Sequence, residues 1–133
     1  MLLLSTTYFG PIQWYQKLNR YDHVLIEHHE HFQKQTYRNR CLIATAQGVQ
    51  ALTVPVSGDE ALISDHGNWR HVHWQAIRSA YGDSPFFEYY EDDLRPFFVE
   101  RRWRTLYDFN MDICQTMCRL LDIHPHIQPT TTY

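Results

Sequence analysis

The first 27 residues follow a pattern that few folds accommodate. An apolar run at residues 2–9 predicts a strand, and Gly10-Pro11 ends it because proline suits the first position of a helix. A helix is then predicted over residues 11–19, followed by a second strand over residues 22–27 that is apolar enough to be buried on both faces. If the two strands are parallel, the connection is right-handed and both carboxyl ends open on the same side of the sheet.

The remaining sequence predicts a hairpin followed by helices. Two β-rich runs at residues 40–45 and 50–56 flank the turn residue Gly48, which favours an antiparallel hairpin. Helices are predicted over residues 69–81, from Ser84-Pro85 up to a break at Pro96, and from Thr105 onward. Asn68 is expected to cap the first of them, and Gly82 follows its end. No element is predicted over residues 124–133. We therefore expect one α/β domain over residues 1–133, with the C-terminal helices packed on the sheet; an α+β arrangement is the alternative.

Composition narrows the classes of function. The 133 residues are 44% hydrophobic, which is enough for a single core. The net charge of -3 provides no general attraction to nucleic acid, and no apolar stretch is long enough to insert into a membrane. Three cysteines, an odd number, argue against a disulfide framework and favour a cytoplasmic location. The oligomeric state is not predicted.

A dense polar run at residues 27–40 follows the second predicted strand. Ligands of open α/β sheets bind outside the carboxyl ends of the strands, so this run is the candidate site. Its second half carries Lys34, Arg38, Asn39 and Arg40, which suit a small anionic substrate because guanidinium groups bind carboxylate or phosphate in pairs of hydrogen bonds. The alternative interpretation is a charged edge that protects the hairpin from aggregation. Residues 38 and 40 would share one face of a strand, which favours the site interpretation.

Histidines supply the candidate proton-transfer groups. His29 and His31 would share one face of an extended segment beside Glu27 and Glu30, and His73 lies within the predicted apolar face of the 69–81 helix. That face consists of Trp69, Val72, Ala76, Ile77 and Ala80. Three alternatives stay open. His73 is a hydrogen-bonded core residue; at least one of His28, His29 and His31 lies in a solvated loop; or these three hold a metal with His73 or His71 as a further ligand. No cofactor is otherwise predicted.

Aromatic residues make up 15% of the chain and belong mostly to the core and its margin. Three of them, Tyr8, Trp14 and Tyr81, are candidates to stack on a sugar or base of the substrate. The sequence contains no glycine-rich phosphate loop and no Gly-x-Ser-x-Gly turn.

Several stretches resemble the WbqC-like proteins in order and spacing over most of residues 5–112. These stretches are residues 7–15, 34–43, 52–56 after Gly48, Trp69-Arg70 with His73-Trp74, Ala80-Tyr81 and residues 84–90. The resemblance implies a role in the synthesis of surface polysaccharide such as O-antigen, and it carries over no assigned catalytic residue. Two departures stand out. Residues 5–7 replace a usual Gln-Pro pair, and the C-terminal segment of the family is expected to be missing, through either a short variant or a truncated chain.

Three hypotheses follow. The first is a cytoplasmic transferase that acts on an activated sugar or acyl donor, with the cations of residues 34–40 holding its anionic group and a histidine moving the proton. The second is a non-catalytic module that binds an anionic metabolite or a partner. The third is a metal-dependent hydrolase built on the histidines.

Overall fold

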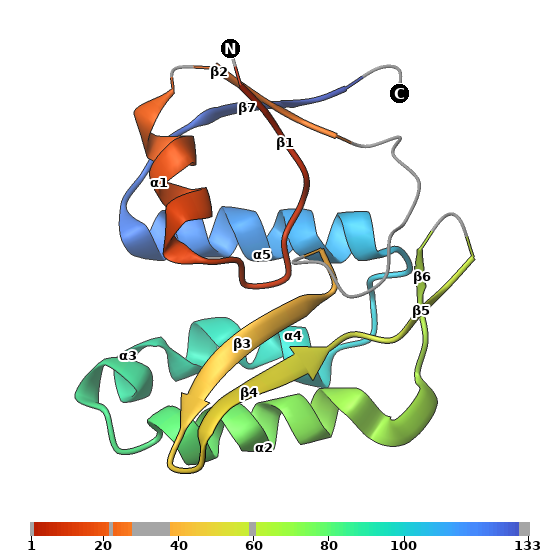
Figure 1. Cartoon of the computed structure of the whole chain (residues 1–133), viewed down its shortest axis with the longest axis vertical. Helices are drawn as coiled ribbons and strands as arrows, with labels where there is room; N and C mark the ends of the chain where they lie inside the picture. The colour runs from red at the N-terminus through yellow and green to blue at the C-terminus, as the bar shows by residue number, and fades with distance from the viewer. Residues whose placement is uncertain (1, 22, 28–37, 59–60, 131–133) are drawn as a thin grey trace.

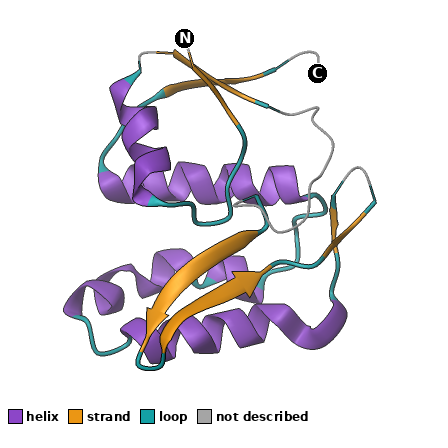
Figure 2. Cartoon of the chain, viewed as in Figure 1, coloured by secondary structure: helices purple, strands orange, loops and turns teal. Residues whose placement is uncertain are grey.

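The computed structural model describes residues 2–21, 23–27, 38–58 and 61–130, which form two halves joined by one long helix (Figure 1). In chain order the elements are β1 (Leu2–Leu4), α1 (Ile12–Arg20), β2 (His23–Ile26), β3 (Arg40–Thr45), β4 (Gly48–Thr53), β5 (Val56–Ser57), β6 (Leu62–Ile63), the 3-10 turn η1 (His66–Asn68), α2 (Trp69–Tyr81), α3 (Pro85–Leu94), α4 (Pro96–Val99), α5 (Leu106–Leu121) and β7 (His126–Pro129). The fold is mixed α/β, as expected, with helices dominating the C-terminal half (Figure 2).

A parallel sheet in the order β1-β2-β7 forms one half. The predicted strand–helix–strand unit is confirmed, because β1 and β2 pair in parallel with α1 between them. The first strand ends at Leu4 instead of residue 9. Beyond the strands, Glu27 N donates to Leu4 O at 2.8 Å and Thr130 N donates to Ile26 O at 3.0 Å. All three carboxyl ends therefore meet at one edge of the sheet.

The prediction that residues 124–133 contain no element is wrong. His126–Pro129 forms β7, which pairs with β2 and places Ile127 beside Val24. The sequence signal is weak because Ile127 is the one strongly apolar side chain in the strand. Pairing here satisfies the backbone groups on the second edge of β2, which is a requirement that no local pattern records.

Within the described part of the chain, helices cover one face of this sheet. Val24 and Ile26 are buried against α1 and α5, whereas Leu3 on the opposite face is 57% exposed and Leu25 is half-buried. The expectation that the second strand is buried on both faces is therefore wrong. An apolar run of this length does not distinguish a strand covered on both faces from one covered on one face.

The hairpin of β3 and β4 forms the sheet of the other half. Its register pairs Arg40 with Thr53 and Thr45 with Gly48, and Gly48 has a φ of 114° in the turn. The second predicted strand, residues 50–56, is divided: β4 ends at Thr53, and β5 leaves the hairpin after Pro55 to pair with β6. Proline cannot donate a hydrogen bond to the ladder, which accounts for the division.

Helix α5 lies between the two halves and contributes to both apolar cores (Figure 1). Phe109 and Ile113 pack with α2, α4 and the hairpin, whereas Cys114 and Cys118 pack with α1 and β2. Thr105 caps the helix as predicted, with Oγ1 accepting from Asp108 N at 3.2 Å.

Candidate functional site

A tight loop after β1 directs one side chain into the core. Phe9 adopts a φ of 45°, which is uncommon for a residue with a side chain. A Cβ atom at Gly10 would lie 2.5 Å from Thr7 Oγ1, so only glycine fits there. The loop buries Tyr8 completely, and its ring stacks on Phe109 with the ring centroids 5.9 Å apart.

The buried face of α2 is more polar than its sequence pattern predicts. Arg70 and His73 are 6% and 4% exposed, whereas Val72, which was assigned to the apolar face, is 52% exposed. The face is therefore rotated toward Arg70. Asn68 precedes the helix in the left-handed conformation and makes no side-chain cap, so its predicted capping role is wrong.

Tyr8 and His73 form a buried pair. The Tyr8 hydroxyl and His73 Nδ1 share a hydrogen bond of 2.8 Å, although 65 positions separate the two residues. Burial lowers the pKa of His73 to about 4, with a smaller opposing effect from a hydrogen bond with the Thr53 backbone. Burial also raises the pKa of Tyr8 well above its usual value. At neutral pH both side chains are therefore uncharged.

Arg70 places a positive charge one helical turn before His73. Its Nη1 donates to Asp65 Oδ1, and its guanidinium lies 4.6 Å from the centroid of the Trp69 ring. The hydrogen bond and the charge of Arg70 hold the pKa of Asp65 below its usual range. Arg70 Nε is buried and has no hydrogen-bond partner. Such a donor is costly to bury alone and is suited to an anionic ligand.

Two buried asparagines extend this polar region. Asn110 Nδ2 on α5 donates to Thr6 Oγ1 at 3.0 Å and to Arg38 O at 2.7 Å. Asn39 Nδ2 donates to Val54 O at 3.2 Å. The Oδ1 atoms of both asparagines are buried without a partner. We call the group Tyr8, Asn39, Arg70, His73 and Asn110 the polar centre; it joins the β1–α1 loop, the start of β3, α2 and α5.

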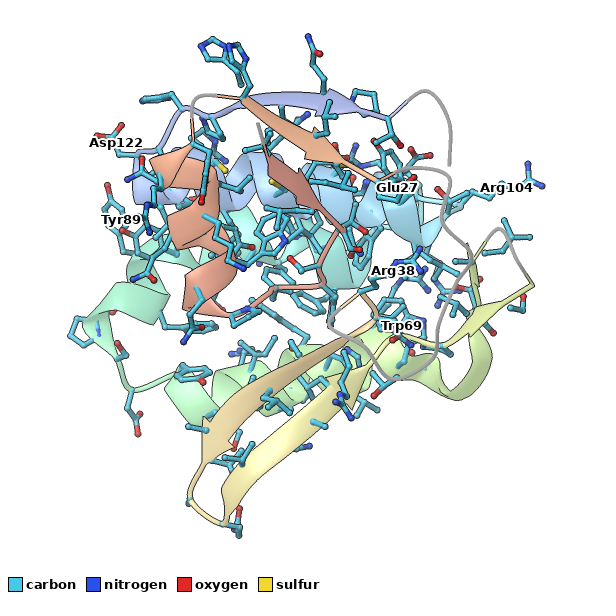
Figure 3. All side chains as sticks on the ribbon, turned by 45° about the horizontal axis from the view of Figure 1, so that its top comes forward. Glu27, Arg38, Trp69, Tyr89, Arg104 and Asp122 are labelled. Atoms are coloured by element: carbon cyan, nitrogen blue, oxygen red, sulfur yellow. The ribbon has the colours of Figure 1, made fainter. Side chains whose placement is uncertain are left out.

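Side chains from the carboxyl edge of the parallel sheet and from the hairpin half lie on one side of the molecule. Figure 3 shows Glu27, Arg38 and Trp69 on that side, and they come from three different parts of the chain. Thr130 Oγ1 donates to Glu27 Oε1 at 2.9 Å, which joins the ends of β2 and β7. Ligands of open α/β sheets bind outside the carboxyl ends of the strands, which predicts a site at this edge, and the polar centre supplies buried polar groups from the other half of the molecule.

The predicted cations occupy positions that differ from the strand argument. Arg38 lies in the turn before β3, so strand alternation does not relate it to Arg40. Arg40 pairs with Thr53, whose backbone contacts His73, and Arg40 Nε is buried without a partner. Arg40 is thus linked to His73 through the Thr53 backbone, and Arg38 O is bonded to Asn110, whereas the predicted Lys34 lies outside the described residues.

Two predicted aromatic residues lie elsewhere. Trp14 Nε1 donates to Ser5 O at 3.0 Å, and its ring packs edge-on against Tyr15 beneath the parallel sheet. The Tyr81 hydroxyl accepts from Ala44 N at 3.1 Å, which joins the end of α2 to the hairpin. Neither residue belongs to the polar centre. His29 and His31, as well as His28 of the metal alternative, lie outside the described residues.

Sequence reasoning missed Arg70 and Asn110 as site residues. Arg70 precedes His73 by three positions, which places both on one face of a helix, so a signal for Arg70 was available. Asn110 had no comparable signal, because a single asparagine on an amphipathic helix indicates nothing about its partners.

Other features lie away from this site. A polar groove of about 530 Å³ is lined by residues of α2 and α3, including Arg78 and Glu91, which lie 3.6 Å apart. A second groove, of about 600 Å³, lies at the end of α5 beside His124. Among the residues that the structure describes, no three His, Cys, Asp or Glu side chains are placed to hold one metal ion. Within the same part of the chain, no helix has the length and apolar character needed to cross a membrane.

Comparison with known proteins identifies the family. The model of the WbqC-like protein family matches residues 6–133. The chain belongs to this family. The WbqC-like chain is also similar to an uncharacterized protein of Mycobacterium tuberculosis, Rv1507c, at 29% identity over 120 residues. That alignment covers 84% of this chain and 52% of the relative, so the chain spans about half the relative's length. No solved structure matches the WbqC-like chain significantly.

Proposed function

We propose that this WbqC-like protein is a cytoplasmic transferase that acts on an activated sugar or acyl donor in surface polysaccharide synthesis, such as that of O-antigen. The observation that carries the proposal is the pair of buried guanidinium nitrogens, Arg40 Nε and Arg70 Nε, that have no acceptor. Activated donors carry phosphate groups, which guanidinium groups bind with directed, charge-assisted hydrogen bonds. The family membership supports a role in surface polysaccharide synthesis. The odd cysteine count supports a cytoplasmic location.

In this proposal Arg38, Arg40 and Arg70 hold the anionic leaving portion of the donor. The attacking hydroxyl or amine of the acceptor must lose a proton, and a neutral imidazole accepts one. His73 is neutral at pH 7 because its pKa is about 4, and it lies one turn from Arg70. His29 and His31 are the other proposed bases.

A non-catalytic module that binds an anionic metabolite is the second candidate. It is favoured by the burial of Tyr8 and His73, which are 0% and 4% exposed and already bonded to each other. A base that is enclosed in this way positions its neighbours without receiving a substrate proton. The same arginines would bind the ligand in both candidates.

Ligand binding tests what both candidates share. We expect one class of ligand to bind when a nucleotide-sugar, an acyl-CoA and inorganic phosphate are compared by thermal shift and calorimetry. Arg70→Gln is expected to weaken that binding at least tenfold, because it removes the charge and the unpaired donor. Arg95→Gln is the matched control, since the Arg95 side chain is 56% exposed and pairs weakly with Asp92 at 3.8 Å. Equal affinity in both variants would contradict an anion site at Arg70.

Turnover separates the two candidates. Release of the leaving group from the bound donor, measured with a panel of hydroxyl and amine acceptors, is expected for the wild-type protein. His73→Gln is expected to retain ligand affinity and to lose at least 100-fold in turnover, as is usual for removal of a general base. Binding of the donor without turnover of any acceptor would instead favour the non-catalytic module.

A further inference from the structure

A pair of histidines lies at the opposite edge of the parallel sheet from the candidate site. His23 begins β2 and His126 begins β7, and the two residues are direct neighbours in the parallel register. Both are exposed, and their ring centroids are 5.6 Å apart with an angle of 36° between the rings. The pair lies on the face of the sheet opposite α1 and α5, which it shares with Leu3 and Leu25.

The spacing of the rings suits one transition-metal ion. A zinc–imidazole bond is about 2.0–2.1 Å long and lies in the plane of the ring, so the ion sits roughly 3 Å from each ring centroid. One ion can therefore bridge rings whose centroids are up to about 6 Å apart, a limit that the observed 5.6 Å satisfies. Imidazole nitrogen is a preferred ligand of Zn²⁺, Ni²⁺ and Cu²⁺, whereas Mg²⁺ takes oxygen ligands.

We propose that His23 and His126 bind one divalent transition-metal ion, each through one ring nitrogen, with water in the remaining coordination positions. The ion joins the first residues of β2 and β7 across the strand pair. It thus ties the C-terminal strand to the centre of the sheet, at the edge opposite the carboxyl ends of the strands. This site involves none of the residues proposed to bind the substrate.

Neighbouring side chains provide a matched control. His124 is also exposed and lies two residues before His126, but its Nε2 pairs with Asp122 Oδ1 at 3.1 Å. Within the described part of the chain, the ring that lies against His23 is that of His126, and the His124 ring lies against Asp122. A histidine close in sequence but outside the ring pair is therefore available for comparison.

Calorimetry with Zn²⁺ on protein that carries no histidine tag tests the proposal. We expect one ion for each chain, tighter binding of Cu²⁺ than of Zn²⁺ and no binding of Mg²⁺. His23→Ala and His126→Ala are each expected to weaken Zn²⁺ binding at least tenfold, and His124→Ala less than twofold. Zn²⁺ should also raise the unfolding temperature of the wild-type protein and of His124→Ala, but not that of the other two variants.

Two results would overturn the proposal. The first is the absence of Zn²⁺ and Cu²⁺ binding to the wild-type protein at millimolar concentration. The second is binding that survives both His23→Ala and His126→Ala, as an ion held by His28, His29 and His31 would. Because all the substituted side chains are exposed, circular dichroism is expected to show the same fold in each variant.

Discussion

At the scale of single residues, the feature that stands out is the burial of polar groups without complete hydrogen bonding. Buried polar atoms in folded proteins are nearly always paired, so each exception requires a reason. Arg40 Nε, Arg70 Nε and the Oδ1 atoms of Asn39 and Asn110 are such exceptions among the described residues. They come from different elements, and Thr7 Oγ1 beside Tyr8 is a further such atom, as is the hydroxyl of Tyr15. This concentration indicates binding more directly than any local motif in the chain does.

The buried state of His73 predicts a pH dependence of stability. Its pKa is about 4 in the folded protein, against a usual value of 6.5. Between these values the unfolded chain binds more protons, so acid favours unfolding. The contribution of neutral His73 to the free energy of unfolding, about 3 kcal/mol, is complete above pH 6.5 and is lost as the pH falls toward 4. Urea unfolding between pH 7.5 and 4.5 measures this dependence.

Two substitutions control for the other titrating groups. His73→Gln should flatten the loss of stability between pH 6.5 and pH 4.5, because glutamine does not titrate. Val72→Gln, at a position of the same helix that is 52% exposed, should leave the slope unchanged because it alters no titrating group. A wild-type slope in His73→Gln would contradict the lowered pKa, because it would mean that His73 binds protons equally in the folded and unfolded states.

At the scale of elements, helix boundaries follow local chemistry whereas helix faces follow packing. Pro85 begins α3, Pro96 separates α3 from α4, and Thr105 caps α5, all as predicted. The buried face of α2 differs from the predicted face, because it contains Arg70 and His73 in place of Val72. The partners of these polar side chains lie on other elements, so no periodicity within α2 reveals them.

The cap of α5 gives a test at this scale. Thr105→Ala removes the hydrogen bond from Asp108 N to Oγ1 and is expected to lower the free energy of unfolding by about 1 kcal/mol. Ser84 occupies the corresponding position of α3 and makes no side-chain cap. Ser84→Ala should therefore cost clearly less in the same urea titration. Equal losses in the two variants would show that the Thr105 cap contributes nothing specific.

At the scale of the whole molecule, α5 makes the two halves interdependent. It contributes Phe109 to the core beneath the hairpin and Cys114 to the core beneath the parallel sheet, and Met117 packs against both. Asn110 adds hydrogen bonds to Thr6 and to the backbone of Arg38. Loss of either core therefore removes support from the helix that serves the other.

This arrangement predicts a single cooperative unfolding transition. Phe109 is 1% exposed and contacts the rings of Tyr8, Trp69, Phe97 and Trp103. Phe109→Ala should cost about 3–5 kcal/mol and lower the stability of both halves together. Tyr89→Ala, at a side chain that is 78% exposed, should have little effect.

Two spectroscopic measurements check the cooperativity. Tryptophan fluorescence reports mainly on the core of the hairpin half, which holds Trp69, Trp74 and Trp103. Circular dichroism reports on all helices. We expect coincident transitions in the wild-type protein and in Phe109→Ala. Separate midpoints would show that the two halves unfold independently.

The sequence by itself determined the features that depend on near neighbours in the chain. The β1–α1–β2 unit, the hairpin around Gly48 and the helix starts at Pro85 and Thr105 all follow from proline geometry, glycine turns, capping and apolar periodicity. The family resemblance was likewise legible from the order of its stretches, and the family model confirms it. Tyr8, Asn39, Arg40 and His73 were chosen from their chemistry as residues of one site, and that role stays a prediction.

Only the tertiary structure decided which of these side chains meet. The 2.8 Å bond between Tyr8 and His73 depends on the loop after β1 reaching α2, and sequence distance carries no information about that contact. The same holds for the hydrogen bonds of Asn110, for the unpaired Nε of Arg70 and for the pairing of β7 with β2. Each results from backbone and side-chain groups that find partners far along the chain once the apolar faces have packed. Local propensity therefore does not predict these contacts.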